Sequence, residues 1–283
     1  MMLQRTKMGP NLVPDLGLGR MVQDGLIFRQ NVYIRSYEVG PDGKALVETL
    51  MHLVQLDSQE ATANSMKTVG LMFEGFGSAE MSKKNLIWVM LKMQMIVDRY
   101  PTWGDILQID ICKVPYGKNG VCCNITFCDC KTGEILVRAS SIWVMMNKKT
   151  RKLSRFPNEV RTILEQYFMD TPPIVVQNTG TWSEREDNFD EHICKGLKSV
   201  PKTVMGKYEI DSMTLEYYRE CTKDSVLQSI TSILVNRNGE IGNFDVDCQH
   251  LLQHEKGGGN GNVMKGTTRW RLKHGKSQDS GAC

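Results

Sequence analysis

One pattern occurs twice in this sequence, as RASSIWV at residues 138–144 and as KGTTRWR at residues 265–271. In each copy a basic and a small residue precede two hydroxyl residues, one variable residue and a tryptophan. A second match lies upstream of each copy, where Leu107-Gln108 corresponds to Leu227-Gln228. The two matches come in the same order and at similar offsets (227 against 107, and 270 against 143), which predicts a duplicated fold.

Each copy also carries two strand candidates separated by a polar turn. In the first copy NLIWVMLKMQMIV at 85–97 is followed by the turn YPTWGD at 100–105 and by ILQIDI from Ile106. In the second copy MTLEYYREC at 213–221 is followed by TKD and then by SVLQSITSIL. We interpret each pair as a strand hairpin, so we expect consecutive strands to pair with each other.

The two copies differ in what precedes the long strand. The first has a strand candidate at 26–38 and a helix candidate at 48–69, which ends at Gly70 and for which Ser58 is an alternative N-cap. The second has only residues 181–211 for the same elements, and these are polar and show no sustained helical apolar stripe. We therefore expect the second copy to lack most of its helix.

A basic connector separates the copies. It begins with NKKTRKLSRFP at 147–157, continues as a short amphipathic helix and ends near Pro172-Pro173; the apolar face of the helix consists of Val160, Ile163, Leu164 and Tyr167. The predicted organisation is an N-terminal extension (1–22), a first domain (23–147), a basic linker with a short helix (148–180), a truncated second domain (181–275) and a tail (276–283).

Composition excludes several classes of protein. The formal net charge is +3, from 35 basic and 32 acidic residues, which is too balanced for bulk nucleic-acid binding. No apolar run has the length of a membrane span, and the N-terminus reads neither as a secretory signal nor as a transit peptide. The nine cysteines are odd in number and irregularly spaced, so we expect reduced thiols. The group Cys122, Cys123, Cys128 and Cys130 lacks a C-x2-C knuckle, so we expect no metal and read them as strand residues.

Several long motifs resemble the plant acyl-acyl-carrier-protein thioesterases, and the wording KKNLIWV resembles the saturated-acyl (B-type) members. They are residues 23–38, 85–89, 98–105, 117–120, 129–141, 143–147 and 213–228. The resemblance implies an α+β double hot-dog fold, in which each antiparallel sheet wraps a central helix. It also implies hydrolysis of the thioester of fatty acyl-acyl carrier protein in the plastid stroma, without a cofactor. The partner is the acyl carrier protein, and a homodimer is left open.

The family's catalytic elements match this chain only in part. An Asp-x-Asn-x-His motif is expected after a Gly-Leu pair such as Gly196-Leu197, but the sequence contains no such motif and Leu197 runs directly into Lys198. We interpret this as an internal deletion. A Glu-Cys pair in a Tyr-Arg-x-Glu-Cys context is implied to be functional, and it corresponds to Glu220 and Cys221.

The remaining pair leaves two mechanisms open. Strand alternation would place Glu220 and Cys221 on opposite faces unless a bulge intervenes. Glu220 is a candidate general base for water if burial raises its pKa, whereas Cys221 would need a nearby histidine. His192 is the candidate substitute for the missing one. Without the motif the chain is expected to be weakly active or inactive, and a non-catalytic acyl or carrier-protein binding module is the alternative.

Three further stretches bear on substrate contact. A basic group is a candidate docking site for the acidic carrier protein, or else a solvated linker; it comprises Lys148, Lys149, Arg151, Lys152 and Arg155. Met90, Met93 and Met95 are candidates to line an acyl tunnel, with plain core packing as the alternative. Relatives usually read R-R-D-W where this chain has Cys122-Cys123-Asn124-Ile125, so two cations and an aromatic ring are missing there.

Overall fold

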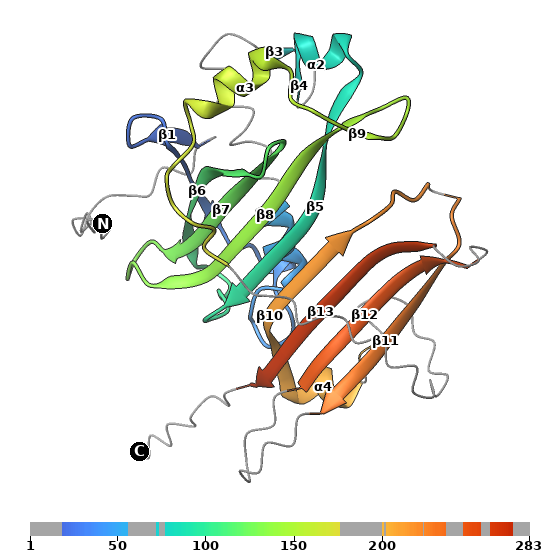
Figure 1. The fold of residues 1–283 in the computed structure, drawn as a ribbon. Coiled ribbons are helices and arrows are strands. Elements are labelled where there is room, and N and C mark those ends of the chain that lie inside the picture. The colour runs from blue at the N-terminus through green and yellow to red at the C-terminus, as the bar shows by residue number, and fades with distance from the viewer. Residues whose placement is uncertain are drawn as a thin grey trace, which may run out of the picture. The chain divides into compact units, whose positions relative to one another are not determined.

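The computed structural model describes residues 19–55, 72–73, 77–175, 200, 202–222, 224–235, 246–255 and 261–273. The chain divides into two compact units, Met1–Asn178 and Thr179–Cys283. Each unit contains one antiparallel sheet (Figure 1). No helix in the described ranges is long and apolar enough to cross a membrane.

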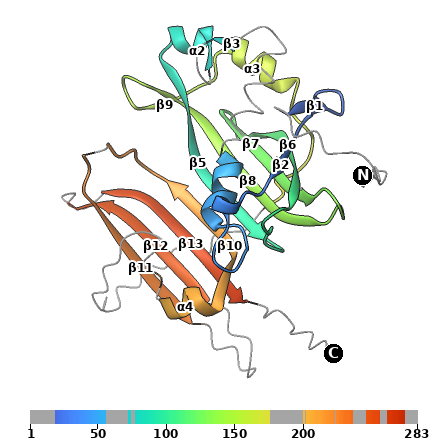
Figure 2. The ribbon, with the colours of Figure 1, turned by 180° about the vertical axis from the view of Figure 1, so that it is seen from behind.

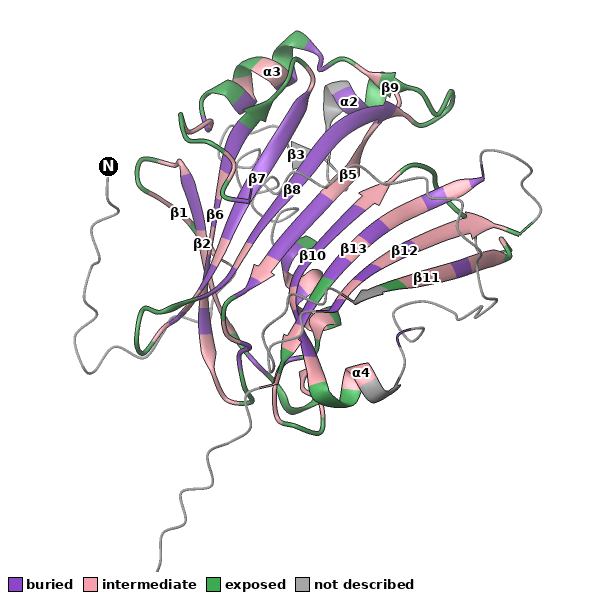
Figure 3. Ribbon diagram, turned by 60° about the horizontal axis from the view of Figure 1, so that its bottom comes forward, coloured by how far each residue is buried: buried purple, intermediate pink, exposed green. Residues whose placement is uncertain are grey.

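Unit 1 has its main strands in the order β1-β2-β6-β7-β8-β5, with β9 paired to β8. The strands are β1 (Arg20–Val22), β2 (Ile27–Tyr33), β5 (Leu86–Val97), β6 (Ile106–Tyr116), β7 (Gly120–Asp129), β8 (Ile135–Asn147) and β9 (Leu153–Ser154). A separate pair is formed by β3 (Met72–Phe73) and β4 (Gly77–Ser78). Short helical elements are η1 (Ser36–Glu38), α2 (Ala79–Lys83) and α3 (Asn158–Glu165). Buried residues are concentrated along β7 and β8 (Figure 3), which lie inside the sheet.

Unit 2 repeats the core of this arrangement. Helix α4 (Lys202–Lys207) leads into β10 (Tyr208–Tyr217), which is followed by β11 (Leu227–Val235), β12 (Val246–His254) and β13 (Asn262–Leu272). These strands lie in the order β10-β13-β12-β11, which is the order β5-β8-β7-β6 of unit 1. The predicted duplication is therefore confirmed.

The predicted hairpins are wrong. β5 pairs with β8 rather than β6, and β10 pairs with β13 rather than β11. In unit 1 the cause lies in the turn after β5: Trp103 N donates to Gly43 O and Gly104 N donates to Ile34 O, at 3.1 Å each. These bonds attach the turn to the segment that follows β2. The next strand therefore begins beside β2, with Ile106 opposite Tyr33, instead of folding back on β5.

The repeated tryptophan pattern makes the same contact in both sheets. The indole Nε1 of Trp143 donates to Ser141 Oγ at 2.9 Å, and that of Trp270 donates to Thr268 Oγ1 at 2.8 Å. Residues two apart on a strand share a face, so each hydroxyl lies within reach of its own tryptophan. The strand opposite each tryptophan has a register irregularity at the same place, between Met90 and Lys92 and between Ile210 and Ser212.

A helix lies on one face of the unit 1 sheet (Figure 2). It begins at residue 47 and is described through residue 55, so a start at Ser58 was wrong; the remainder of the 48–69 candidate lies outside the described residues. Its side chains Leu50 and Val54 are fully buried. The sheet face beneath is apolar, because Ile111, Ile125 and Ala139 stand in one row across β6, β7 and β8 and are 0–1% exposed.

The corresponding row of unit 2 is more polar, since it consists of Thr231, His250 and Gly266. His250 Nδ1 bonds with Thr231 Oγ1 at 3.0 Å and its Nε2 bonds with Thr268 Oγ1 at 2.9 Å. Gly266 leaves room for the Leu215 side chain of the neighbouring strand, because a Cβ at position 266 would lie 2.8 Å from Leu215 Cδ2.

Among the described residues of unit 2, α4 is the one helix, and it has six residues. The segment 181–211, where the sequence left too little room for a central helix, is described only at residue 200 and from residue 202 onward, and its other residues lie outside the described ones.

The connector is fastened to unit 1 by Asn124. Helix α3 buries Val160 and Leu164, as its apolar stripe predicted, and the chain then passes over β7 and β8. Asn124 Nδ2 donates to Pro172 O at 3.2 Å, and Asn124 Oδ1 accepts from Ile174 N at 3.0 Å and from Ser140 Oγ at 3.1 Å. Asn124 is only 1% exposed, so removal of its side chain would leave these buried polar groups without their hydrogen bonds.

We expect Asn124→Ala to lower the free energy of unfolding by about 2–3 kcal/mol, because buried polar groups lose their partners. Hydrogen exchange at the Ile174 amide should accelerate in the same variant. Asn158→Ala, at an exposed position in α3, is the control and should leave both quantities close to wild type. An Asn124→Ala protein with unchanged exchange at Ile174 would show that the clamp does not hold the connector.

His250 makes stability depend on pH. Burial lowers its pKa to about 4, below the usual 6.5, so the unfolded chain binds the proton more readily than the folded one. Stability from this group is complete above pH 6.5 and decreases as the pH falls toward 4, by about 3 kcal/mol in total. Urea unfolding of wild type and His250→Gln between pH 7.5 and 4.5 should show the difference between them shrinking as the pH falls. A constant difference would contradict the assignment.

Candidate functional site

The Glu-Cys pair lies beyond the end of its strand. β10 ends at Tyr217, because Tyr218 N and Arg219 N both donate to Val263 O, at 2.9 and 3.3 Å, and the chain leaves the sheet there. The predicted strand at 213–221 therefore begins earlier and ends earlier than expected. Glu220 and Cys221 are both exposed. Strand alternation no longer assigns them to opposite faces.

The surroundings of the pair are polar and shaped by a turn. Thr222 N donates to Ser225 Oγ and Ser225 N donates to Thr222 O, each at 3.0 Å. Tyr218 OH donates to Glu216 Oε2 at 2.8 Å, and partial burial together with this bond raises the pKa of Tyr218. The Glu220 side chain is exposed beside this turn.

Three histidines lie in the described residues, and none of them is hydrogen-bonded to Cys221. Both ring nitrogens of His250 are engaged by threonine hydroxyls. His52 lies exposed on the unit 1 helix, and His254 ends β12, opposite Leu227. His192, the candidate substitute, and the junction between Leu197 and Lys198 lie outside the described residues.

The three candidate methionines share the helix-side face of β5. Met90 lies opposite Trp143, Met93 opposite Ser141 and Met95 opposite Ala139. Met90 and Met93 are three residues apart and would point to opposite faces of a regular strand, but the bulge between Met90 and Lys92 brings them to the same one. Met93 and Met95 are 2% and 1% exposed.

The five candidate docking cations gather around one hairpin turn. Lys148, Lys149, Arg151 and Lys152 form the turn between β8 and β9, and Arg155 follows β9; all five are exposed. Asn147 Oδ1 accepts from Lys149 N at 3.0 Å and from Thr150 N at 2.9 Å, which fixes the turn. The cations therefore project from a defined structure rather than from a loose connector.

A buried lysine was not singled out by the sequence reasoning. Lys113 is 3% exposed and stands opposite Cys123 on the helix-side face, and burial lowers its pKa. The signal was present, because Ile109, Ile111 and Lys113 alternate along β6. Lys113 therefore places a cation opposite Cys123, one of the two positions at which relatives were expected to have an arginine. Cys122 and Cys123 are buried, and burial raises the pKa of Cys122 to about 12.

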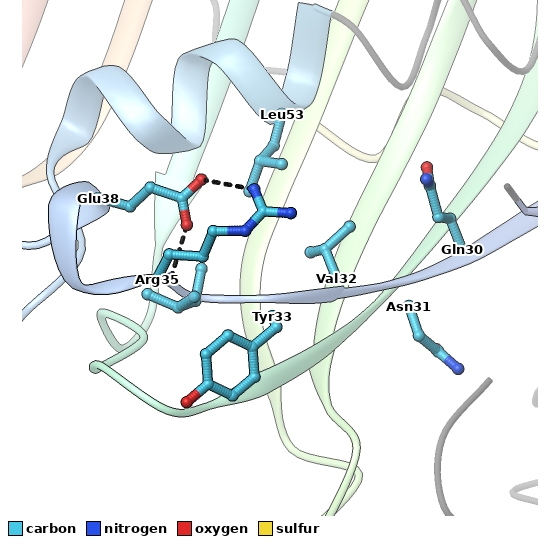
Figure 4. A pocket seen from close by; sticks show the side chains of 8 residues that line it. Gln30, Asn31, Val32, Tyr33, Arg35, Glu38 and Leu53 are labelled. Carbon is cyan, nitrogen blue, oxygen red and sulfur yellow. Dashed lines mark hydrogen bonds and ion pairs between the residues drawn. The ribbon is translucent and has the colours of Figure 1, made fainter. Parts of the chain in front are cut away.

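Unit 1 also contains a small cavity beside β2, which no sequence pattern predicted. Figure 4 shows Gln30, Val32 and Leu53 pointing into the same space from β2 and from the helix. The cavity measures about 190 Å³, and Arg35 and Glu38 stand at one end. Arg35 N donates to Glu38 Oε2 at 2.7 Å, and the guanidinium Nη1 lies 3.7 Å from Glu38 Oε1.

Comparison with known proteins covers both units. The family model of the acyl-ACP thioesterase N-terminal domain matches residues 25–164, and that of the C-terminal domain matches residues 195–272. A palmitoyl-acyl carrier protein thioesterase, chloroplastic, from Gossypium hirsutum is 43% identical over 303 residues, covering 98% of this chain and 72% of the relative. A chloroplastic dodecanoyl-[acyl-carrier-protein] hydrolase from Umbellularia californica is 37% identical, covering 88% of this chain and 69% of the relative.

Solved structures agree with the sequence relatives. The 12:0-ACP thioesterase from Umbellularia californica superposes with a TM-score of 0.71 at 36% identity, covering 89% of this chain and 96% of that one. An acyl-ACP thioesterase from Bacteroides thetaiotaomicron gives a TM-score of 0.62 over 86% of this chain and 97% of that one; at 15% identity that likeness shows the fold alone. The fold is the double hot-dog that the resemblance implied.

The alignment with the Gossypium relative spans 303 positions, whereas this chain has 283 residues, so the relative has residues at positions where this chain has none. With both domain models matched and two fifths of the residues shared with curated relatives, this chain belongs to the acyl-ACP thioesterase family.

Proposed function

We propose that this chain binds saturated fatty acyl-acyl carrier protein and hydrolyses its thioester, releasing free fatty acid and ending chain elongation in the plastid. The observation that carries the proposal is the match of both halves to the two thioesterase domain models, with 43% identity to a palmitoyl-acyl carrier protein thioesterase. The chloroplastic names of the relatives support the plastid location.

In the proposed chemistry Glu220 is the general base for the attacking water. Cys221 is not the nucleophile. Two observations support this choice: both ring nitrogens of His250 are engaged by threonine hydroxyls, and no described histidine is hydrogen-bonded to Cys221. The oxyanion that forms still needs donors. The Asp-x-Asn-x-His motif implied by the family would supply them, and this sequence lacks it. We therefore propose slow turnover.

A non-catalytic binding module is the second candidate, and the exposure of Glu220 favours it. An exposed carboxylate without oxyanion donors has little advantage over bulk water, whereas the apolar helix-side face of unit 1 is intact. In this case the chain would bind the acyl carrier protein and its acyl group without releasing the fatty acid. The predicted domain boundaries, the methionine-lined tunnel and a homodimer stay predictions under either candidate.

Turnover separates the two candidates. With palmitoyl-acyl carrier protein, we expect the wild-type rate to lie about 100-fold or more below that of a relative that has the full motif, since each lost oxyanion donor costs roughly 100- to 1,000-fold. Glu220→Gln should abolish what remains, whereas Cys221→Ser should retain it. Release of palmitate is the measurement. Binding without any release would favour the module, and loss of activity in Cys221→Ser alone would favour the thiol.

Charge reversal tests the docking turn. We expect Lys149→Glu with Lys152→Glu to weaken binding of acyl carrier protein about five- to tenfold at low salt, because each exposed charge pair contributes up to about 1 kcal/mol. The effect should fade as salt rises. Lys131→Glu is the matched control, because Lys131 is exposed in the turn at the other end of β8. Equal weakening by Lys131→Glu would show that net charge, and not this turn, drives the encounter.

A further inference from the structure

The unit 2 sheet ends in a long strand with one neighbour. β11 is the last strand of the order β10-β13-β12-β11, and in the part of the chain that the structure describes it pairs with β12 alone. Figure 1 and Figure 2 both show it as the outermost strand of its sheet. Its counterpart in unit 1, β6, pairs on that side with the seven residues Ile27–Tyr33 of β2. Along β11 every second residue directs its N–H and C=O away from β12.

The sequence of β11 has none of the features that protect an exposed edge. The strand has nine residues, LQSITSILV, without a charged residue or a proline, and its register with β12 has no irregularity. Native proteins blunt a free edge with a charge, a proline, a bulge or a very short strand. The outermost strand of unit 1, β1, follows that rule, since it has three residues and contains Arg20. The composition of β11 therefore indicates an edge that is paired.

β11 is complementary to a second copy of itself. In an antiparallel pair related by a twofold axis, each residue faces the one at the same distance beyond the axis, and both lie on the same face of the sheet. With the axis at Ile230, residues of like character face each other along the overlap. The pairs are Ile230 with itself, Ser229 with Thr231, Gln228 with Ser232 and Leu227 with Ile233.

We propose that β11 is the contact surface for a second copy of this chain, and that the two β11 strands pair antiparallel about a twofold axis at Ile230. Backbone hydrogen bonds join the two unit 2 sheets into one. The pairing also brings Leu227 of one copy against Ile233 of the other, a side chain that is 38% exposed in the single chain. Because each copy contributes one strand, the interface is small and the dimer is expected to dissociate on dilution.

Residue 230 faces its own copy in this dimer, so charges placed there report on the pairing directly. Ile230→Lys sets two cations opposite each other and Ile230→Glu sets two anions, so each variant alone should dimerise at least about tenfold more weakly than wild type. An equimolar mixture of the two should restore the dimer, because each lysine then faces a glutamate. Leu272→Lys, at an exposed apolar position of β13 in the same unit, is the control and should dimerise as wild type does.

Sedimentation velocity over a range of protein concentrations measures the dimer, and hydrogen exchange identifies the strand. The β11 amides that point away from β12 should be protected in concentrated protein and should exchange faster on dilution. A wild-type chain that sediments as a monomer at every concentration would overturn the proposal, and protected β11 amides in that monomer would assign the edge to a segment of the same chain. A dimer that Ile230→Lys leaves intact, or that the mixture of variants fails to restore, would also overturn it.

Discussion

In each sheet one bulge, opposite a buried tryptophan, determines which side chains of its strand face the helix side. In β8 and in β13 the indole of that tryptophan donates to the hydroxyl two residues before it, which orients the ring beside the bulge. A slip of one residue would turn the whole strand over, so a bulge pinned by a large side chain determines which residues face the helix side. The bulge in β5 is what places Met90, Met93 and Met95 on one face.

With the same register, the two units have different interiors. The unit 1 row of Ile111, Ile125 and Ala139 is apolar and suits a packed helix, whereas unit 2 has Thr231, His250 and Gly266 at the equivalent places. The polar side chains of unit 2 are satisfied by one another through the His250 bonds. The row that packs against a helix in unit 1 is therefore polar and internally hydrogen-bonded in unit 2.

Local pattern predicted much of the fold. The duplicated tryptophan strands, the long strand at 85–97 and the amphipathic helix α3 are confirmed, and so is the double hot-dog architecture that the family resemblance implied. The hairpins were wrong because pairing was decided by non-local bonds of Trp103 and Gly104, which no local pattern reveals. The end of β10 was misplaced because the bonds to Val263 come from another strand. Of the site, Glu220, Cys221 and the basic turn stay predictions from the sequence and the family resemblance, whereas the burial of Lys113 and of Gln30 Oε1 becomes visible only in the structure.

The central claim is that the second repeat lacks the segment that completes the site. The most direct measurement inserts, between Leu197 and Lys198, a segment with the Asp-x-Asn-x-His motif that the family resemblance implies, and compares palmitate release from palmitoyl-acyl carrier protein before and after. The account predicts a gain of about 100-fold or more, since oxyanion donors return, and a gain that Glu220→Gln removes. A folded insertion variant with the rate of the original chain would contradict it.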